Sequence, residues 1–317
     1  MAFWLDNNRE LILSGRPFIA YREPGEIFPV VEAGEGSLKF GRVTVDPWPG
    51  SAPSPSVPSE STSRRSYTET LDALISQLKQ SGGKTVVQRV INGSFKAFDP
   101  LAMLDAFFVS PTSTFDFVLF DPSAAWWIGR SPELLLETEG RTFRTRALAG
   151  TRPRGVVGEW SSKNRDEHEM VVADICSRLD GLCLKVTRHP IETFDCGAVS
   201  HLMTPISVGC LSSDVSSDVL FRRIVEEIHP TPAVGGFPRE HAVAAIPALE
   251  SHERQLYGGV ISVASRCAYV VLRCAHFDSS RWAVHTGSGI TACSDADDEW
   301  YETQAKASPL VEFLSRF

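Results

Sequence analysis

The chain has 317 residues and a formal net charge of −8, and 43% of its residues are hydrophobic and 22% charged. This length allows one large domain or two ordinary ones, and the composition is that of a globular protein with a sizeable core. No basic run offsets the acidic balance, so we expect no nucleic-acid partner. An anionic small molecule is not excluded as a substrate, because the charge of the local site decides its binding.

The N-terminal residues and the cysteines indicate whether the protein is a membrane, secreted or cytoplasmic one. No run of about 18 apolar residues is present, so we expect no membrane-spanning helix. Residues 1–10 include Asp6 and Glu10 and lack the apolar stretch of a secretory signal. The seven cysteines are odd in number and contain no Cys-x-x-Cys pair, which argues against a zinc site or a disulfide framework. We therefore expect a cytoplasmic protein.

The first part of the sequence predicts a few short strands followed by a linker. Strand-like pieces occur at residues 11–13, 18–21 and 43–45. Residues 48–65 are rich in proline and serine, which is typical of a loop or linker with little core potential. We expect residues 1–65 to pack on a catalytic domain formed by residues 66–317.

Beyond residue 66, helical and strand-like segments are mixed irregularly. Leu71, Leu74, Ile75 and Leu78 fall at the i, i+3, i+4 and i+7 positions of one helix face. Further helices are predicted at residues 164–182, 219–228, 238–249 and 297–314, and strands at 84–91, 115–120, 126–128, 134–138, 259–263, 269–277 and 282–286. This mixture predicts an α+β fold rather than a regular βαβ alternation.

Acidic residues in three segments are candidates for chemistry. Glu133 lies at the mouth of a predicted strand, and Glu167 lies near the start of an amphipathic helix, where acidic groups usually complement the helix dipole. Glu299 and Glu302 share a helix face, with Lys306 one turn further on, which suits a hard cation such as Mg²⁺. Taken singly, each pattern is more typical of a solvated surface.

Glycine-rich and proline-rich segments are candidates for ligand binding. Residues 146–155, RALAGTRPRG, predict a turn whose backbone N–H groups and hydroxyl could meet an anion. Residues 229–238, HPTPAVGGFP, predict a rigid loop between two helices. Residues 285–290, HTGSGI, predict a strand that runs into a Gly-x-Gly turn, which alone is weak evidence.

Together, in this order and at these spacings, the segments resemble those of the chorismate-binding enzymes. This family includes isochorismate synthase, salicylate synthase, anthranilate synthase component I and aminodeoxychorismate synthase component I. The resemblance covers about residues 66–317 and is specific, because six blocks match: KTVVQR, SPELLL, ALAGTRPRG, DEHEMVV, HPTPAVGGFP with ESHERQLYGG, and HTGSGI leading to EWYETQAK. It implies two packed, mainly antiparallel β-sheets flanked by helices, with chorismate bound in a deep cleft.

Three positions separate the subfamilies. By this resemblance, Lys84 stands where isochorismate and salicylate synthases carry a lysine. The ammonia-using members of the family carry a glutamine there. Ala149 stands where aminodeoxychorismate synthases carry a nucleophilic lysine, and Ala233 resembles the residue of isochorismate synthases. The resemblance therefore favours isochorismate synthase, which converts chorismate to isochorismate with water and needs no amidotransferase subunit.

The resemblance also implies how the reaction is catalysed. Lys84 would be the base that activates water for attack at ring carbon C2, and Glu133 the acid that protonates the departing C4 hydroxyl. The cleft must favour the neutral form of both side chains, which burial does. A Mg²⁺ ion would be held by Glu167 and Glu302, with Glu299 helping directly or through water.

The remaining site residues are implied to bind the substrate. Tyr257 and Arg273 would hold one carboxylate with backbone N–H groups of the 287–289 turn, because the guanidinium fork matches a carboxylate. The implied substrate-binding positions are Gly150, Thr151, His229, Ala233, Tyr257, Arg273, Gly287, Gly289 and Lys306.

Two positions depart from the family pattern, and three alternatives stay open. Asn164 replaces an acidic residue common three positions before Glu167, and Gln255 replaces a glycine two positions before Tyr257. The alternatives are a salicylate synthase, which also eliminates pyruvate, an ammonia-using subunit with a glutamine-hydrolysing partner, and a non-catalytic chorismate-binding protein. Menaquinone, siderophore and salicylate pathways all use isochorismate and are all compatible with the sequence.

Overall fold

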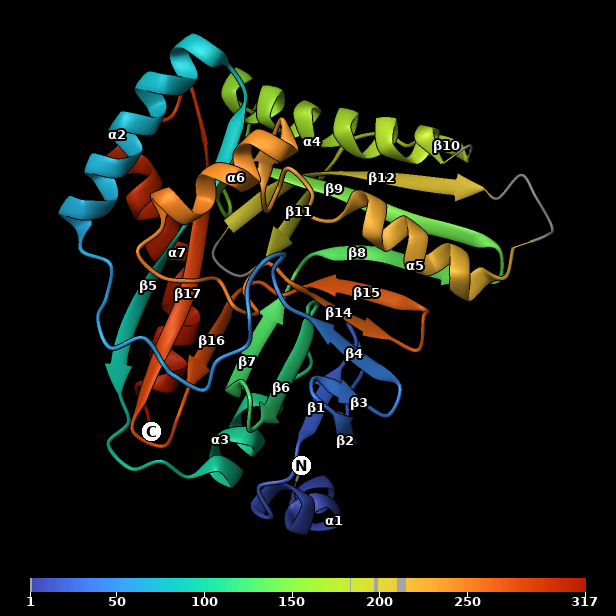
Figure 1. Ribbon diagram of the computed structural model, residues 1–317, viewed down its shortest axis with the longest axis vertical. Coiled ribbons are helices and arrows are strands. Elements are labelled where there is room, and N and C mark those ends of the chain that lie inside the picture. The colour runs from blue at the N-terminus through green and yellow to red at the C-terminus, as the bar shows by residue number, and fades with distance from the viewer. Residues whose placement is uncertain (1, 183, 197–198, 210–214) are drawn as a thin grey trace.

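The computed structural model describes residues 2–182, 184–196, 199–209 and 215–317. Two antiparallel β-sheets lie at a steep angle to each other, and helices cover their outer faces (Figure 1). The predicted α+β fold of two packed, mainly antiparallel sheets is therefore confirmed. No described helix combines the length and the apolar character that a membrane crossing requires.

The helices bring their apolar faces onto the two sheets. They are α1 (Ala2–Leu13), α2 (Arg64–Ser81), α3 (Pro100–Phe107), α4 (Ser162–Gly181), α5 (Ser217–Ile228), α6 (Arg239–Leu249) and α7 (Ala296–Leu314). α2 and α7 lie beside the first sheet, whereas α4 and α5 lie along the second (Figure 1). Four helices, α2, α4, α5 and α7, start in the same way, since the side chains of Ser63, Ser161, Ser216 and Asp295 accept hydrogen bonds from first-turn N–H groups.

The first sheet has the strand order β2-β1-β6-β7-β16-β17-β5-β13. Its strands are β1 (Phe18–Arg22), β2 (Val30–Gly36), β5 (Lys84–Ser94), β6 (Phe115–Asp121), β7 (Ala125–Ser131), β13 (Gly236–Phe237), β16 (Cys274–Phe277) and β17 (Arg281–Thr291). The pairing of β5 with β17 runs over the full length of both strands, from Lys84 opposite Thr291 to Ser94 opposite Arg281.

The second sheet has the order β12-β9-β8-β15-β14-β4-β3, with β10 and β11 both paired to the outer side of β12. Its strands are β3 (Lys39–Phe40), β4 (Val43–Asp46), β8 (Leu134–Glu139), β9 (Thr142–Pro153), β10 (Lys185–Arg188), β11 (Glu192–Cys196), β12 (Val199–Gly209), β14 (Val260–Val263) and β15 (Cys267–Val270). β2 joins the two sheets, because it pairs with β1 in the first and with β3 in the second.

The N-terminal strands extend both sheets. β1 pairs with β6, and β4 pairs with β14. The predicted strand at residues 11–13 was wrong, because these residues end helix α1. Trp4 and Ile12 are both buried in the cluster that contains Met103 and Phe108 of the α3 region, so α1 is fixed by tertiary packing. Such packing is not visible in a short apolar triplet.

The predicted strand at residues 269–277 was also wrong, because two strands divide it between the sheets. β15 pairs with β8 in the second sheet, and β16 pairs with β7 in the first. The chain crosses between them at Arg273, whose φ of 47° lies in the left-handed region. Non-glycine residues adopt this conformation only where the surroundings impose it. Here it ends one strand and redirects the chain into the other sheet.

A buried aromatic cluster holds the two sheets together. Phe115 of the first sheet and Tyr269 of the second stack with ring centres 4.2 Å apart. Trp127 from the first sheet and Ile261 from the second belong to the same cluster.

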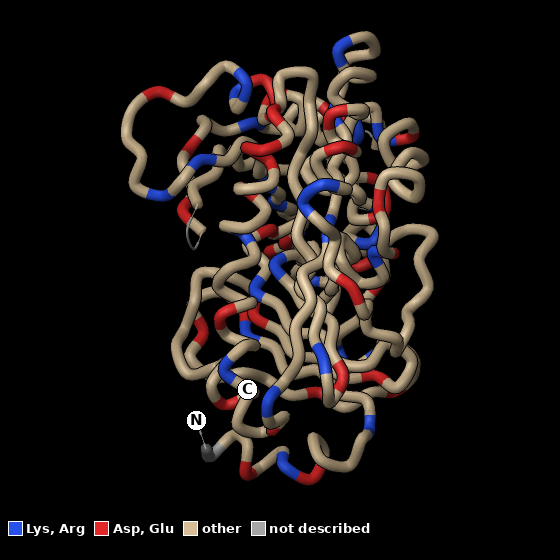
Figure 2. Tube along the Cα trace, turned by 90° about the vertical axis from the view of Figure 1, so that its left-hand side faces the viewer, with Lys and Arg blue, Asp and Glu red and all other residues tan. Residues whose placement is uncertain are grey.

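Charged residues of both signs are spread along the chain rather than gathered in one patch (Figure 2).

Leu71 offers a test of the packing of α2, because its side chain is fully buried against β5 and β17 neighbours. We expect Leu71→Ala to lower the free energy of unfolding by about 2–5 kcal/mol through the cavity it leaves. Urea unfolding followed by circular dichroism measures this change. Gln77→Ala on the exposed face of the same helix is the control and should stay within about 0.5 kcal/mol of wild type. Equal losses for both variants would contradict the packing.

Candidate active site

A cavity of about 660 Å³, part of it open to solvent, lies where the two sheets meet α4 and α7. Most of the residues proposed from the sequence line it, which brings together side chains from six separate blocks. The predicted site residues in its lining are Lys84, Glu133, Gly150, Thr151, Glu167, Ala233, Tyr257, Arg273, Gly287, Gly289, Glu302 and Lys306. The two predicted residues outside this lining are His229 and Glu299.

Lys84 is the first residue of β5 and is 2% exposed. Its Nζ lies 2.7 Å from Oε1 of Glu167 on α4 and forms a salt bridge. Gly289 on β17 leaves the room for this pair, because a Cβ there would lie 2.8 Å from Oε1 of Glu167 and 2.9 Å from Nζ of Lys84. The predicted base is therefore held at one end of the cavity by a carboxylate.

Glu133 lies between β7 and β8, where the chain passes from the first sheet to the second. Its hydrogen-bond partners are few: Oγ1 of Thr231 lies 3.4 Å from its Oε1 and donates to it. Burial raises the pKa of Glu133 to about 7, against the opposing charges of Lys84 and Arg146. A carboxyl group with this pKa is partly protonated at neutral pH and can donate a proton.

Gly150 forms a bulge inside β9, so the turn predicted for residues 146–155 was wrong. Its φ is 74°, and the register with β12 shifts between His201 and Leu202. A Cβ on Gly150 would lie 2.8 Å from the carbonyl oxygen of Asn164, so the close approach of α4 requires glycine. The bulge turns residues 149–151 toward the cavity.

Asn164 departs from the family's acidic residue, and the structure gives it a different contact. Its Nδ2 donates to the carbonyl oxygen of Thr151 at 3.3 Å. An ionised carboxylate could not donate this bond. Asn164 therefore ties the start of α4 to the bulge of β9 instead of adding negative charge to the cavity.

His201 is a cavity residue that the sequence analysis missed. Nη2 of Arg273 lies 3.3 Å from Nε2 of His201, and because arginine can only donate, Nε2 accepts. Nδ1 then carries the proton and donates to the carbonyl oxygen of Gly150 at 3.3 Å. Burial and the charge of Arg273 hold the pKa of His201 well below its ordinary value, so the ring is neutral. A lone histidine in a strand gives no sequence signal for this role.

Gly287 and Gly289 lie within β17, so the predicted Gly-x-Gly turn was wrong. Nζ of Lys306 donates to the carbonyl oxygen of Gly287 at 3.1 Å, which places that carbonyl on the α7 side. N–H and C=O of one strand residue point to the same side, so the N–H of Gly287 also points away from β5. A Cβ on Gly287 would lie 2.7 Å from the hydroxyl of Tyr257. The two glycines therefore keep this wall of the cavity open.

Gln255 replaces the family's glycine and still adopts its conformation, since its φ is 50°. The carbonyl oxygen of Gln255 accepts a hydrogen bond from the N–H of Trp48 at 2.8 Å. Gln255 therefore holds a left-handed conformation two residues before Tyr257, at the conformational cost that a non-glycine residue has in this region.

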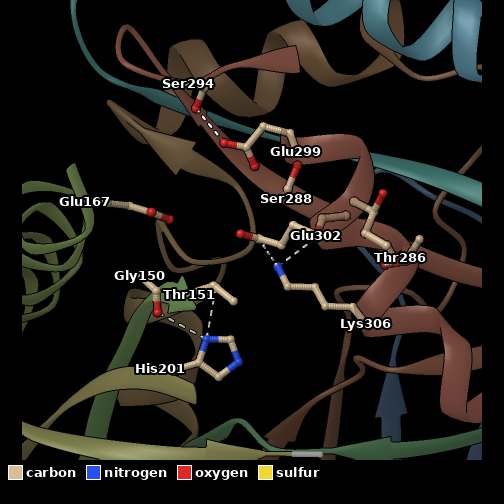
Figure 3. Close-up of polar contacts among 12 residues, drawn as sticks. Gly150, Thr151, Glu167, His201, Thr286, Ser288, Ser294, Glu299, Glu302 and Lys306 are labelled. Atoms are coloured by element: carbon tan, nitrogen blue, oxygen red, sulfur yellow. Dashed lines mark hydrogen bonds and ion pairs between the residues drawn. The ribbon is translucent and has the colours of Figure 1, made fainter. Parts of the chain in front are cut away.

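The three predicted metal ligands each have a lysine partner. Oε1 of Glu302 lies 2.6 Å from Nζ of Lys306 on the same helix, and the charge of Lys306 outweighs burial, so the pKa of Glu302 is lowered. Glu167 is paired with Lys84, as described above. The carboxylates of Glu167 and Glu302 point toward each other across the cavity from α4 and α7 (Figure 3).

Glu299 lies outside the lining of the cavity and accepts hydrogen bonds from two donors. Its Oε1 lies 2.7 Å from Nζ of Lys163 and 2.8 Å from Oγ of Ser294. Burial and the charge of Glu302 raise its pKa. Lys163 was missed in the sequence, although it precedes Glu167 by one helical turn on α4, a spacing that places both on one face.

His229 is not among the residues that line the cavity, and its contact with the substrate ring stays a prediction. Burial and the charge of Arg239 lower its pKa to about 3, so its ring is neutral. Its carbonyl oxygen accepts a hydrogen bond from Nη1 of Arg239 at 3.3 Å, and its ring lies edge-to-face on Trp48. These contacts give His229 a structural role in the loop.

Residues 44–315 match the sequence pattern of the chorismate binding enzymes. The chain belongs to this family. A relative, the isochorismate synthase MenF of Pasteurella multocida, is 31% identical over 244 residues, which cover 70% of this chain and 55% of the relative. The chain spans between 39% and 61% of the length of the curated relatives it matches.

Solved structures show the same architecture. The menaquinone-specific isochorismate synthase MenF from Escherichia coli superimposes with a TM-score of 0.68 and 26% identity, covering 80% of this chain and 61% of that one. A Bacillus anthracis protein described as a 2,3-dihydroxybenzoate-specific isochorismate synthase shares the fold, with a TM-score of 0.72, 22% identity and coverage of 99% and 88%.

Gly289 provides a test of the cavity geometry. We expect Gly289→Ala to push apart Lys84 and Glu167 and to lower the free energy of unfolding by about 1–3 kcal/mol. Thermal unfolding measures the loss. Gly36→Ala, in a strand where nothing lies within 4 Å of the added Cβ, is the matched control and should leave stability nearly unchanged. If both variants behave alike, the cavity has more room than the structure shows.

Proposed function

We propose that the protein is an isochorismate synthase, which converts chorismate to isochorismate. The observation that carries the proposal is the joint presence of Lys84 and Glu133 in one cavity, with Glu133 buried and partly protonated at neutral pH. The names of the relatives support the same reaction. The chain covers little more than half of several relatives, so the activity needs its own test.

The reaction needs one proton acceptor and one proton donor. A water molecule attacks C2 of the ring and loses a proton, while the C4 hydroxyl leaves as water after gaining one. Glu133 is suited to give the second proton, because its protonated form is present near pH 7. Lys84 is suited to accept the first only when it is neutral. Its salt bridge to Glu167 must therefore be broken before it acts.

The substrate's carboxylates have suitable partners in the cavity. Arg273 lines it with a guanidinium group that is hydrogen-bonded to neutral His201 rather than to a carboxylate. The hydroxyl of Tyr257 faces Gly287 in the same wall. A carboxylate of chorismate would therefore meet an arginine fork and a phenol, with the backbone of Gly287 beside them.

The residues also fit a magnesium ion, which we propose as the cofactor. Among the described residues, no three acidic, histidine or cysteine side chains converge to hold a metal by themselves. Magnesium usually takes one or two carboxylates and completes its shell with water and substrate oxygens, and Glu167 and Glu302 face each other across the cavity in this way. Glu299, which does not line the cavity, would support the site through its hydrogen bonds with Lys163 and Ser294. The bound ion would neutralise a carboxylate of the substrate.

Two residues in the cavity, Ala149 and Lys84, support water as the nucleophile and a simple isomerisation. Ala149 lines the cavity at the position where aminodeoxychorismate synthases would carry a nucleophilic lysine. Its methyl group offers no amine for a covalent intermediate. Lys84 lines the cavity where ammonia-using members would carry glutamine.

The deciding experiment is the incubation of the purified protein with chorismate and Mg²⁺, without ammonia, with products separated by chromatography. We expect isochorismate as the product, no reaction after chelation of the metal, and no reaction with Lys84→Ala. Salicylate with pyruvate would assign the protein to the salicylate synthases. Binding of chorismate without turnover would mean that the proposed reaction is wrong.

Glu133 gives the reaction a predicted pH dependence. The proton donor is the neutral carboxyl group, so kcat should fall as pH rises through about 7, where this group ionises. Glu133→Gln keeps the shape but cannot donate a proton as an acid, so kcat should fall by about 10²- to 10⁴-fold. Steady-state rates across neutral pH test both points. A wild-type kcat that is flat through this range would argue against Glu133 as the acid.

A further inference from the structure

A second cavity of about 730 Å³ lies beside the first. Arg273 and Lys306 line both cavities, so these two side chains form the partition between them. Phe107, Leu310 and Phe313 provide an apolar wall, and Arg130 adds a third cation. Part of this volume is open to solvent, so a ligand can reach the recess from outside.

The charge of this second cavity is unusual for the protein. Its lining contains three cationic side chains and no acidic one among the residues that the structure describes. The chain as a whole has a net charge of −8. A positive recess in an acidic protein attracts anions locally, because field lines are concentrated between low-dielectric walls.

Arg130 is held in position but has no close carboxylate partner in the described structure. Its Nη2 donates to the carbonyl oxygen of Phe107 at 2.6 Å, and its guanidinium carbon lies 4.4 Å from the centre of the Phe107 ring. Asp116 is the nearby acid, but its Oδ1 lies 3.9 Å from Nε of Arg130. The side chain remains 39% exposed, so solvent can reach it.

Other donors already satisfy Asp116. Nη2 of Arg22 lies 2.6 Å from one carboxylate oxygen, and Oγ1 of Thr112 and of Thr114 lie 2.8 Å and 2.9 Å from the other. The charge of Asp116 is therefore largely neutralised by Arg22. The positive charge of Arg130 is left available to a ligand in the second cavity.

Arg273 and Lys306 connect this cavity to the chemistry. Arg273 is hydrogen-bonded to neutral His201, and Nζ of Lys306 reaches the carbonyl oxygen of Gly287 in the first cavity. Arg273 therefore lines the second cavity together with Arg130 and shares the lining of the first cavity with Tyr257 and Gly287.

We propose that the second cavity is an entry site, where Arg130 binds a carboxylate of the ring substrate before it passes to Arg273. The apolar wall of Phe107, Leu310 and Phe313 contacts the carbon skeleton. The proposal rests on the proposed function for the identity of the ligand, chorismate. The same chemistry would also suit a carboxylate effector that binds there and does not react, and the experiment separates the two.

The test measures association of chorismate with Mg²⁺ by stopped-flow tryptophan fluorescence in a Lys84→Ala background, where the proposed base is absent. We expect Arg130→Gln to lower the association rate constant about tenfold at low ionic strength. The difference should shrink as added salt screens the charge. Arg130→Lys should retain most of the rate, because it keeps the charge but loses the guanidinium fork.

Arg281→Gln is the matched control, because it removes the same charge from an exposed arginine whose partner is Asp278. Its association rate should equal that of the background. An association rate unchanged by Arg130→Gln would overturn the proposal, as would equal losses for the Gln and Lys variants, which indicate a structural role. In otherwise wild-type protein, loss of inhibition by excess chorismate on Arg130→Gln, with an unchanged association rate in the Lys84→Ala background, would identify an effector site and also overturn the proposal.

The same data separate this proposal from the function. If wild-type protein makes isochorismate while Arg130→Gln matches Arg281→Gln, only the entry site is wrong. If the background binds no chorismate and the wild type makes no product, the proposed function itself has failed. Thermal unfolding of all variants shows whether a change in rate comes from loss of the fold.

Discussion

The site depends on the way the chain crosses between two packed sheets. Glu133 lies between β7 and β8, and Arg273 lies between β15 and β16, so each stands where a strand leaves one sheet for the other. The backbone carbonyl of each still accepts a hydrogen bond, Glu133 from the N–H of Val270 and Arg273 from the N–H of Arg130, which holds both crossings in place. The stack of Phe115 on Tyr269 fixes the sheets, and thereby fixes the positions of the two crossings.

Electrostatic balance is the second constraint on the cavity. Four buried or half-buried carboxyl groups lie in or next to it, and three of them are paired with lysines. Glu133 has no such partner, which is why burial can raise its pKa to about 7. A lysine partner favours the ionised form of a carboxyl group, whereas burial favours its neutral form. The different pKa shifts of these similar carboxyl groups therefore follow from their burial and their partners.

Much of the fold and of the site could be predicted from the sequence, because it rests on local patterns or on motifs. The face of α2 follows from its helical spacing, and Lys84, Glu133 and Glu302 follow from blocks that resemble a family. The bulge at Gly150 and the break at Arg273 could not be predicted, since each is imposed by packing between distant segments. His201 was missed for the same reason. It acquires its role only because β12 lies against β9.

The long pairing of β5 with β17 has a consequence for synthesis of the protein. Lys84 lies opposite Thr291, so one wall of the cavity consists of two strands that are far apart in the chain. On the ribosome, β5 emerges long before its partner. During that interval it exposes unpaired backbone N–H and C=O groups together with apolar side chains. Closing so long a loop is slow compared with local folding. The cavity is therefore complete only after β17 has emerged, and interruption of the chain before β17 leaves it without that wall.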